Sequence, residues 1–415
     1  MPIFNKAKML LPNNIDFSKW SVVACDQYTS EPKYWEDAKL VVGNNPSALN
    51  IIFPEIFLND PDKKERVKNI NQAMDKYIEQ GVLKETEPCL IYVERTLKNK
   101  TVRRGIMGVV DLEEYDFNKG STSKIRATEG TVLERIPPRV EIRENASLEL
   151  PHIMLLIDDD KKEIIEPLSE IKESFEKVYD FELMLDSGSI KGYKIDDKKA
   201  DEIIEKLEKF GDKELFKNKY NVDKEVLMYA VGDGNHSLAT AKTCYENLKK
   251  KVGKENAICA RFALLELVNL HDDSLEFEAI HRVVFGVDTE KIISELKSKY
   301  NLTEGENDVS FEIVTKDGIK SYIIENPDFN LTVGCIQSFI DSYLSKNEGE
   351  VDYIHGEDVV KNLSQKENNV GIILKSMLKT DLFKTVILDG ALPRKTFSMG
   401  EACDKRFYLE GRKIK

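Results

Sequence analysis

The segment VGDGNHS at residues 231–237 joins a hydrophobic strand-like run to a helix-like run. Glycines let a backbone approach a ligand closely, and a helix N-terminus offers unpaired N–H groups and the positive end of a dipole to a phosphate. We therefore expect phosphate binding by a group of neighbouring residues: Gly232, Gly234, Asn235, His236 and Ser237. Asp233 would hold Mg²⁺ or orient a hydroxyl. The alternative is an ordinary strand-to-helix turn in which Asp233 or Ser237 only caps the helix.

Neither standard phosphate motif fits this turn. The G-x-x-x-x-G-K-[ST] pattern of a P-loop is absent from the sequence. Gly232-x-Gly234-x-x-Ser237 is similar to a dinucleotide fingerprint, but the segment about 20 residues further on is a lysine-rich helix rather than a strand that ends in an acid. A dinucleotide-dependent oxidoreductase is therefore an alternative that nicotinamide binding would reveal.

A second cluster lies at residues 125–143. It combines an acid and two hydroxyls with arginines at four-residue steps: Thr128, Glu129, Thr131, Arg135, Arg139 and Arg143. Such a group can deprotonate an alcohol and bind anions. The alternative is a solvated helix face with local ion pairs. Pro137 and Pro138 argue against a continuous helix there.

Three further segments carry polar groups next to apolar runs. His281 and Arg282 stand between apolar neighbours, where a buried arginine would need an anion, although a core histidine is the more common case. Arg394 and Lys395 follow a strand-like run at 386–390, and a surface loop is the equal alternative. Asp26 follows Val22 and Val23, which places an acid at the end of a strand.

Strand and helix signals alternate along the whole chain, which predicts a mixed α/β fold. We expect a hairpin from the runs 89–95 and 102–112, and strands and helices in the following runs: strands 152–158, 225–231, 261–270 and 311–317, helices 61–81, 196–211, 237–250 and 333–346. The chain would form one unit, 1–415, with loose divisions near 188–192 and 301–307. The resulting parts are 1–187, 188–301 and 302–415.

Composition excludes several classes of protein. There are 61 basic and 74 acidic side chains, so the net charge is −13, and a general nucleic-acid binder would need a basic surface. No apolar run approaches the roughly 20 residues of a membrane helix, and the first residues lack the apolar stretch of a signal peptide, so we expect a cytoplasmic protein. The 6 cysteines stand singly, which predicts neither disulfides nor a structural metal.

These segments resemble, in order along nearly the whole chain, the motifs of the family catalogued as domain of unknown function 1015. Four motifs of that family have similar segments here. Residues 233–237 resemble D-G-H-H-R, and residues 128–131, followed by Arg139, resemble H-E-x-T. Residues 279–283 resemble P-x-H-R-V, and residues 393–396 resemble P-x-K-[ST]. Asp26 and the Arg104-Gly105 step also match. Asn235, Ser237 and Thr128 depart from the family pattern, which has His, Arg and His at these places.

Members of that family resemble the ParB/sulfiredoxin superfamily and include free-serine kinases. The resemblance implies a mixed α+β fold in which additional mixed-sheet subdomains elaborate a ParB/sulfiredoxin-like catalytic core. It also implies a kinase that converts free L-serine to O-phospho-L-serine with Mg²⁺. Pyrophosphate, ADP and ATP are the donors described for such kinases, and the altered phosphate turn together with the lack of an adenine-pocket motif favours pyrophosphate.

The resemblance also implies roles for residues. Glu129 would position the acceptor hydroxyl or accept its proton, and Asp233 would bind Mg²⁺. The predicted phosphate or donor ligands are Gly232, Gly234, Asn235, His236, Ser237, Arg139, Arg143, His281, Arg282, Arg394 and Lys395. The predicted acceptor ligands are Asp26, Tyr28, Arg104, Thr128 and Thr131. A nucleotide-responsive ParB-like regulator without turnover is the alternative from another class.

Overall fold

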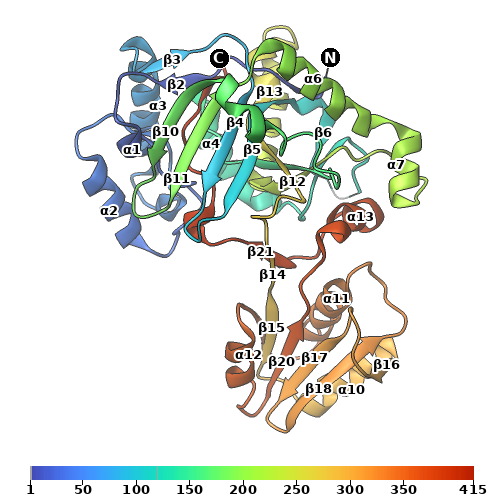
Figure 1. The fold of residues 1–415 in the computed structure, drawn as a ribbon. Helices are drawn as coiled ribbons and strands as arrows, with labels where there is room; N and C mark the ends of the chain where they lie inside the picture. Colours follow the sequence, from blue (N-terminus) through green and yellow to red (C-terminus); the bar gives the residue numbers. More distant parts are fainter. Residues whose placement is uncertain (1, 119) are drawn as a thin grey trace. The chain divides into compact units, whose positions relative to one another are not determined.

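The computed structural model describes residues 2–118 and 120–415 and divides into two units (Figure 1). The larger unit runs to Leu275 and includes the C-terminal segment Glu401–Lys415. The second unit, Glu276–Gly400, is inserted between them. The fold is mixed α/β, as the sequence predicts.

In the described part of the larger unit, ten strands form one mixed sheet in the order β10-β11-β4-β5-β13-β9-β12-β7-β6, with β1 paired to β5. The strands are β1 (Phe4–Asn5), β4 (Ile91–Thr96), β5 (Val102–Asp111), β6 (Tyr115–Asp116), β7 (Ile125–Ala127), β9 (Met154–Ile157), β10 (Glu176–Glu182), β11 (Ser189–Lys194), β12 (Tyr229–Asp233) and β13 (Phe262–Asn269). The central strand β13 is buried over nearly its whole length, which explains its almost continuous run of apolar residues.

The helices of this unit are α1 (Phe17–Trp20), α2 (Pro32–Val42), α3 (Lys63–Glu79), α4 (Ile136–Arg143), α5 (Leu168–Ile171), α6 (Asp197–Glu208), α7 (Lys213–Tyr220), α8 (Asn235–Val252) and α9 (Ile258–Arg261). Short pairs join β2 (Leu10–Pro12) to β3 (Leu83–Glu85) and β8 (Leu148–Glu149) to β22 (Arg412–Lys413). In α6, Asp196 caps the first turn by accepting from the Lys199 N–H, and Ile203, Ile204 and Leu207 are buried on one face.

In the second unit, six strands of the described chain form a sheet in the order β16-β18-β17-β20-β15-β19. They are β15 (His281–Phe285), β16 (Leu302–Glu304), β17 (Phe311–Thr315), β18 (Gly318–Ile324), β19 (Glu350–Ile354) and β20 (Asn369–Leu374). The helices are α10 (Thr289–Tyr300), α11 (Thr332–Leu344), α12 (Glu357–Leu363) and α13 (Lys379–Asp389). At the two ends of the insertion, β14 (Phe277–Ala279) pairs with β21 (Phe397–Met399).

The boundaries of the units differ from the divisions expected near 188–192 and 301–307. The expected division at 188–192 falls inside the β10–β11 hairpin. A Cβ at Gly188 would lie 2.2 Å from the Thr96 carbonyl oxygen, and a Cβ at Gly192 would lie 2.1 Å from the Tyr179 ring. These glycines therefore serve close packing within a sheet rather than a linker. The second falls at the turn after α10, where Asn301 is left-handed with φ 49°.

Two local expectations are wrong. The strand expected at 386–390 is the end of helix α13, in which Leu382, Phe383 and Val386 are buried with helical spacing. Pro137 and Pro138 do not interrupt the helix: they occupy the first turn of α4, where backbone N–H groups have no partner within a helix. The predicted hairpin at β4–β5 and the helices at α3, α6, α8 and α11 are confirmed.

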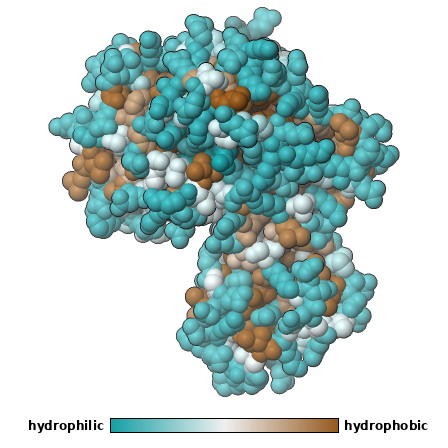
Figure 2. All heavy atoms as spheres, in the orientation of Figure 1, coloured by the Kyte–Doolittle hydropathy of each residue, from teal (hydrophilic) through white to brown (hydrophobic). Residues whose placement is uncertain are grey.

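No helix among residues 2–118 and 120–415 is long and apolar enough to cross a membrane. Figure 2 shows a surface on which hydrophilic side chains predominate and hydrophobic ones form small scattered groups.

Candidate active site

The turn between β12 and α8 carries the glycines singled out in the sequence. Gly234 is left-handed, with φ 78°, and precedes the first residue of α8. A Cβ at Gly234 would lie 3.0 Å from the Ile153 Cα, and one at Gly232 would lie 2.8 Å from the Leu156 side chain. Both glycines are thus required because β12 and the turn pack tightly against β9, next to which β12 runs antiparallel. A dinucleotide fingerprint would instead follow a strand in a parallel sheet.

The first turn of α8 holds the segment that contains Glu129. The Asn235 side-chain oxygen accepts from the Thr128 N–H at 3.3 Å, and the Thr128 hydroxyl donates to the Val231 carbonyl at 2.6 Å. His236 Nε2 accepts from the Val132 N–H at 3.3 Å. The two clusters predicted separately from the sequence therefore meet, and exposed Glu129 lies between their contact points.

His236 is neutral at pH 7 in this position. Burial, the largest cause, and the nearby Arg139 and Arg135 guanidinium groups together lower its pKa to about 4, against the opposing effect of Asp26. His236 can therefore contribute hydrogen bonds to this site, but it contributes no positive charge near pH 7.

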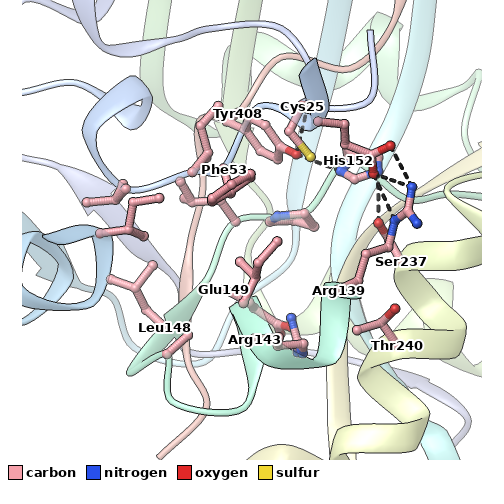
Figure 3. A pocket seen from close by; sticks show the side chains of 18 of the residues that line it. Cys25, Phe53, Arg139, Arg143, Leu148, Glu149, His152, Ser237, Thr240 and Tyr408 are labelled. Carbon is pink, nitrogen blue, oxygen red and sulfur yellow. Dashed lines mark hydrogen bonds and ion pairs between the residues drawn. The ribbon is translucent and has the colours of Figure 1, made fainter. Parts of the chain in front are cut away.

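Ser237, one residue further along α8, contacts His152, which lies two residues before the start of β9. Its Oγ lies 2.9 Å from His152 Nε2 (Figure 3). The Asp26 carboxylate lies 3.7 Å from the same nitrogen. His152 Nδ1 lies 2.7 Å from the Tyr408 hydroxyl, which also accepts from the Cys25 N–H at 3.2 Å. Three segments distant in sequence thus surround one imidazole.

Asp233, the last residue of β12, forms an ion pair. Its Oδ2 lies 3.1 Å from Lys405 Nζ, and its Oδ1 accepts from the Gly234 N–H at 2.8 Å. Burial alone would raise the pKa of Asp233, but Lys405 and His152 outweigh it and hold the pKa below its ordinary value. No group of three or more metal-ligating side chains occurs in the part of the chain that the structure describes. A single carboxylate fits Mg²⁺ that is bound mainly through donor phosphates and water.

The arginines of α4 are paired with acids. Arg139 Nε and NH2 donate to the two carboxylate oxygens of Glu55 at 2.8 and 2.5 Å. Arg143 pairs with buried Glu149, which also accepts from Arg412 Nε at 2.8 Å. Their charges are largely compensated, so their first effect is to fix α4 in place.

A cavity of about 140 Å³ lies beside these groups (Figure 3). Its polar lining includes Glu55, Arg139, His152, Ser237 and Tyr408. The apolar lining comes mostly from residues that precede α3, from α3 itself and from α4: Ile51, Ile52, Phe53, Leu58, Ile70, Met74 and Ile142. A ligand here would meet hydrogen-bonding groups and an apolar wall together.

Other predicted acceptor ligands are differently placed. Tyr28, left-handed with φ 51°, stacks on Tyr34 at 3.9 Å, and burial raises its pKa to about 12. Arg104 in β5 is not among the residues that line the cavity. Its backbone N–H donates to the Asp272 carboxylate, and its guanidinium group donates to the Val102 carbonyl. The Thr131 hydroxyl is buried and has no partner among the described residues.

Four predicted donor ligands belong to the second unit: His281, Arg282, Arg394 and Lys395. Arg282 is fully buried and donates to the carbonyl oxygens of Arg394 and Lys395 at 3.0 and 2.8 Å. The expectation that it needs an anion is wrong, because carbonyl groups and the Gln337 side chain satisfy it. His281 Nδ1 accepts from the Leu374 N–H at 3.2 Å, Arg394 pairs with Asp341, and Lys395 is exposed.

Sequence reasoning missed Glu55, His152, Lys405 and Tyr408. Lys405 and Tyr408 come from the segment that returns to the larger unit after the insertion, which no local pattern indicates. His152 had a usable signal, since it is one of only 5 histidines in the sequence and directly precedes the apolar run of β9.

The family model described as "Protein of unknown function (DUF1015)" matches residues 9–351. The chain belongs to this family. The match covers the motifs at 128–131, 233–237 and 279–283, whereas residues 393–396 lie beyond it. No curated protein matches the sequence.

Several solved structures are similar to this member of the family. A free serine kinase in complex with AMP is 10% identical, with a TM-score of 0.38, and the match covers 74% of this chain and 91% of that one. A conserved hypothetical protein from Pyrococcus furiosus is 13% identical, with a TM-score of 0.35 and coverages of 74% and 94%. SbnI with a C-terminal truncation, from Staphylococcus aureus, is 11% identical, with a TM-score of 0.36 and coverages of 71% and 82%.

Proposed function

We propose that the protein is a small-molecule kinase that phosphorylates the hydroxyl of free L-serine to give O-phospho-L-serine. The observation that carries this proposal is the contact between the α8 turn and the Glu129 segment, through Asn235–Thr128 and His236–Val132. It joins a helix N-terminus, whose N–H groups suit an anion, to the segment of exposed Glu129, and Ser237 in the same helical turn lines the cavity. Phosphoryl transfer depends mainly on such positioning and on electrostatics.

Each polar group has a role in this proposal. The N–H groups at the start of α8 bind the donor's phosphates, and Asp233 holds Mg²⁺, which neutralises phosphate charge when it is bound. Glu129 orients the acceptor hydroxyl or accepts its proton. Asp26, whose carboxylate is partly exposed beside His152, pairs with the ammonium group of free serine.

For the donor we propose inorganic pyrophosphate. A compact donor needs only phosphate contacts, and the N–H groups at the start of α8 together with Mg²⁺ would supply them within the larger unit. Fewer cations are available to a polyphosphate than the sequence suggests, because Arg139 is paired with Glu55 and Arg282 donates to carbonyl groups. The apolar lining of the cavity favours an adenine nucleotide as the second candidate, since it offers a surface for a base.

Product formation tests the proposal. The purified protein is incubated with Mg²⁺, one amino acid of a panel (L-serine, D-serine, L-threonine, L-homoserine) and pyrophosphate, ADP or ATP, and phosphorylated products are measured by mass spectrometry. We expect O-phospho-L-serine as the main product. Binding of a nucleotide without any product would instead indicate a regulator, and binding of a nicotinamide dinucleotide would indicate an oxidoreductase.

Two matched variants give the test a structural basis. Asp233→Asn removes the carboxylate at the end of β12, and we expect at least a tenfold loss of turnover, which corresponds to about 1.4 kcal/mol of activation free energy. Asp223→Asn is the control, because the Asp223 side chain is 93% exposed and its ion pair with Lys217 is long, at 3.8 Å. Equal turnover of the two variants would remove Asp233 from the site.

A further inference from the structure

Ser237 has the surroundings of an activated nucleophile. Its Oγ lies 2.9 Å from His152 Nε2, within hydrogen-bond reach, and the Asp26 carboxylate lies 3.7 Å from that nitrogen. A hydroxyl beside a base that other groups orient is the arrangement from which covalent catalysis proceeds. Nothing in the proposed direct transfer to free serine requires this pairing.

The imidazole of His152 is held rigidly. His152 is 7% exposed and Tyr408 is 2% exposed, and their rings meet edge to face at 5.6 Å with an interplanar angle of 82°. The Tyr408 hydroxyl contacts His152 Nδ1 on one side and the Cys25 N–H on the other (Figure 3). The base therefore has one orientation, and that orientation directs Nε2 at Ser237.

The position of Ser237 suits attack on a bound donor. Ser237 is the third residue of α8, an 18-residue helix whose first N–H groups have no partner within the helix. It also lines the cavity together with Arg139 and His152. A phosphate bound by the first turn of α8 would thus lie next to the Ser237 hydroxyl.

We propose that the donor phosphorylates Ser237 and that the phosphoryl group then passes from Ser237 to free serine. This inference rests on the proposed function, since it needs the donor at the α8 turn. It replaces direct transfer by two displacements that share one phosphoseryl enzyme.

The two steps balance. In the first step, Ser237 Oγ attacks the terminal phosphorus of pyrophosphate and forms an Oγ–P bond. The bond from that phosphorus to the bridging oxygen breaks, and inorganic phosphate leaves. The Ser237 proton moves to His152 Nε2. The reacting tautomer of His152 therefore carries its own proton on Nδ1, and this N–H donates a hydrogen bond to the Tyr408 hydroxyl oxygen. In the second, the hydroxyl of free serine attacks the same phosphorus and gives its proton to Glu129, while the Ser237 Oγ–P bond breaks and His152 returns its proton to Oγ.

Asp26 stabilises the imidazolium that forms between the two steps. Its carboxylate also accepts from the Gln27 side chain at 3.0 Å, which fixes it beside His152. With Asp26 close to Nε2, the positive charge on the ring is compensated while the phosphoseryl enzyme exists.

Isotope exchange without serine tests the inference. The protein is incubated with Mg²⁺, pyrophosphate and ³²P-labelled phosphate but no serine, and label is followed into pyrophosphate; parallel reactions use labelled AMP with ADP and labelled ADP with ATP. A phosphoseryl enzyme catalyses this exchange, because its formation is reversible. Direct transfer requires serine and gives none. Peptide mapping of the enzyme after incubation with a donor labelled in its terminal phosphate should place the label on Ser237.

The variants separate chemistry from folding. We expect Ser237→Ala to lower exchange at least 100-fold and His152→Gln to lower it, while circular dichroism stays that of the unmodified protein. Thr243→Val is the control, since Thr243 lies on the same helix and its hydroxyl donates to the Ala239 carbonyl of that helix at 2.8 Å. This variant should exchange normally.

The outcomes distinguish this inference from the proposed function. O-phosphoserine formed without exchange or label on Ser237 would overturn the phosphoseryl enzyme and leave the kinase intact. Ser237→Ala that exchanges at the unmodified rate would overturn it equally. Labelled Ser237 without any O-phosphoserine would contradict the proposed function and the second step, and the absence of both would contradict both proposals.

Discussion

Lys405 Nζ lies 3.1 Å from the carboxylate of Asp233 and lowers the pKa of that group. The residue at the end of β12 thus receives its positive partner from the C-terminal segment, beyond the inserted unit. The pair favours the ionised form of Asp233 in a partly buried position, where desolvation alone would raise the pKa of the carboxyl group.

Removal of this cation should change the pH dependence of turnover. In Lys405→Met, burial raises the pKa of Asp233 without the main opposing charge, so the acid limb of the pH–rate profile should move to higher pH. Turnover should be lost first in mildly acidic buffers, because Asp233 must be ionised to bind Mg²⁺. Lys413→Met is the control, since Lys413 pairs with Glu85 at 3.5 Å. An acid limb in the same place for both variants would show that Lys405 does not control Asp233.

Glu129→Gln should keep the fold and lower kcat by at least about 100-fold, the smaller end of the range for loss of a general base. The reason is that the amide can still hydrogen-bond the acceptor hydroxyl but cannot take its proton. Glu134→Gln, a change of another exposed acid in the same segment, is the control. Near-normal turnover in a folded Glu129→Gln variant would remove Glu129 from the mechanism.

His236→Ala should raise the apparent KM of the donor more than that of serine. His236 is neutral and ties α8 to the Val132 N–H, so its loss disturbs the first turn of the helix at which we place the donor's phosphates. Steady-state kinetics with each substrate varied in turn gives the two constants. If the KM of serine moves instead, the α8 turn belongs to the acceptor and our assignment is reversed.

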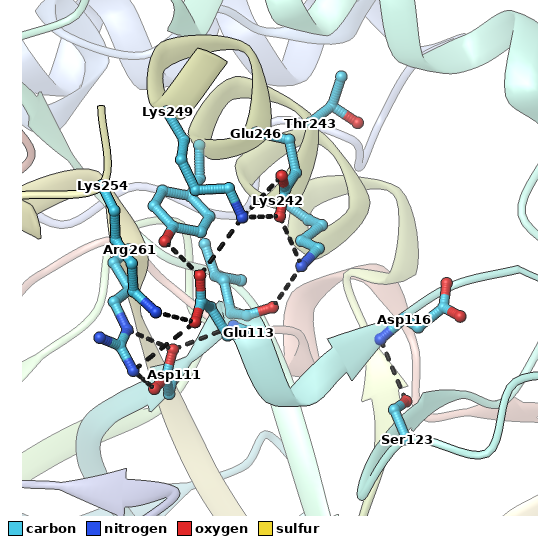
Figure 4. Close-up of polar contacts among 12 residues, drawn as sticks. Asp111, Glu113, Asp116, Ser123, Lys242, Thr243, Glu246, Lys249, Lys254 and Arg261 are labelled. Atoms are coloured by element: carbon cyan, nitrogen blue, oxygen red, sulfur yellow. Dashed lines mark hydrogen bonds and ion pairs between the residues drawn. The ribbon is translucent and has the colours of Figure 1, made fainter. Parts of the chain in front are cut away.

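Glu113 stabilises the larger unit away from the site. It lies in the short helical turn Leu112–Glu114 and accepts from Lys254 at 2.7 Å, Tyr245 at 2.8 Å and Lys249 at 3.3 Å (Figure 4). These contacts lower the pKa of Glu113 to about 2 from an ordinary value of 4.5, and the hydrogen bond from Lys254 has the largest effect. Its contribution is therefore complete above about pH 4.5 and is lost as the pH falls through about 2.

Glu113→Gln should lower the free energy of unfolding at pH 7 by about 1 to 3 kcal/mol, the range for hydrogen bonds to a charged group. The difference from the unmodified protein should shrink as the pH falls below 4.5, where the carboxylate begins to bind a proton in the unfolded chain. Urea unfolding at pH 7 and near pH 3 measures both values. A deficit that does not depend on pH would assign the effect to packing instead of charge.

Much of the scaffold followed from local patterns. The helix α6 was predicted because Ile203, Ile204 and Leu207 form an apolar stripe, and the β4–β5 hairpin because two strand-like runs flank a short polar segment. The meeting of the two main clusters was anticipated only by the motif resemblance. Spacing alone could not show that Asn235 contacts Thr128, since that contact depends on the parallel pairing of β7 with β12.

The remaining parts depend on tertiary contacts without a local signal. The second unit begins and ends in the paired strands β14 and β21, so no change of composition marks its boundaries. His152 and Lys405 become neighbours of Ser237 and Asp233 only when distant segments fold together. The burial of Arg282 was foreseen, but two of its carbonyl partners, Arg394 and Lys395, lie more than 100 positions away along the chain.

Phosphorus NMR of the purified protein with Mg²⁺ and L-serine tests the central claim most directly. Parallel samples contain pyrophosphate, ADP or ATP as the donor, and the Asp233→Asn variant is the control for a contaminating activity. We predict a new O-phospho-L-serine resonance that grows fastest, relative to donor concentration, in the pyrophosphate sample. Turnover with ATP or ADP but not pyrophosphate would overturn our choice of donor. No O-phosphoserine with any of these donors would contradict the assignment of this protein as a free-serine kinase.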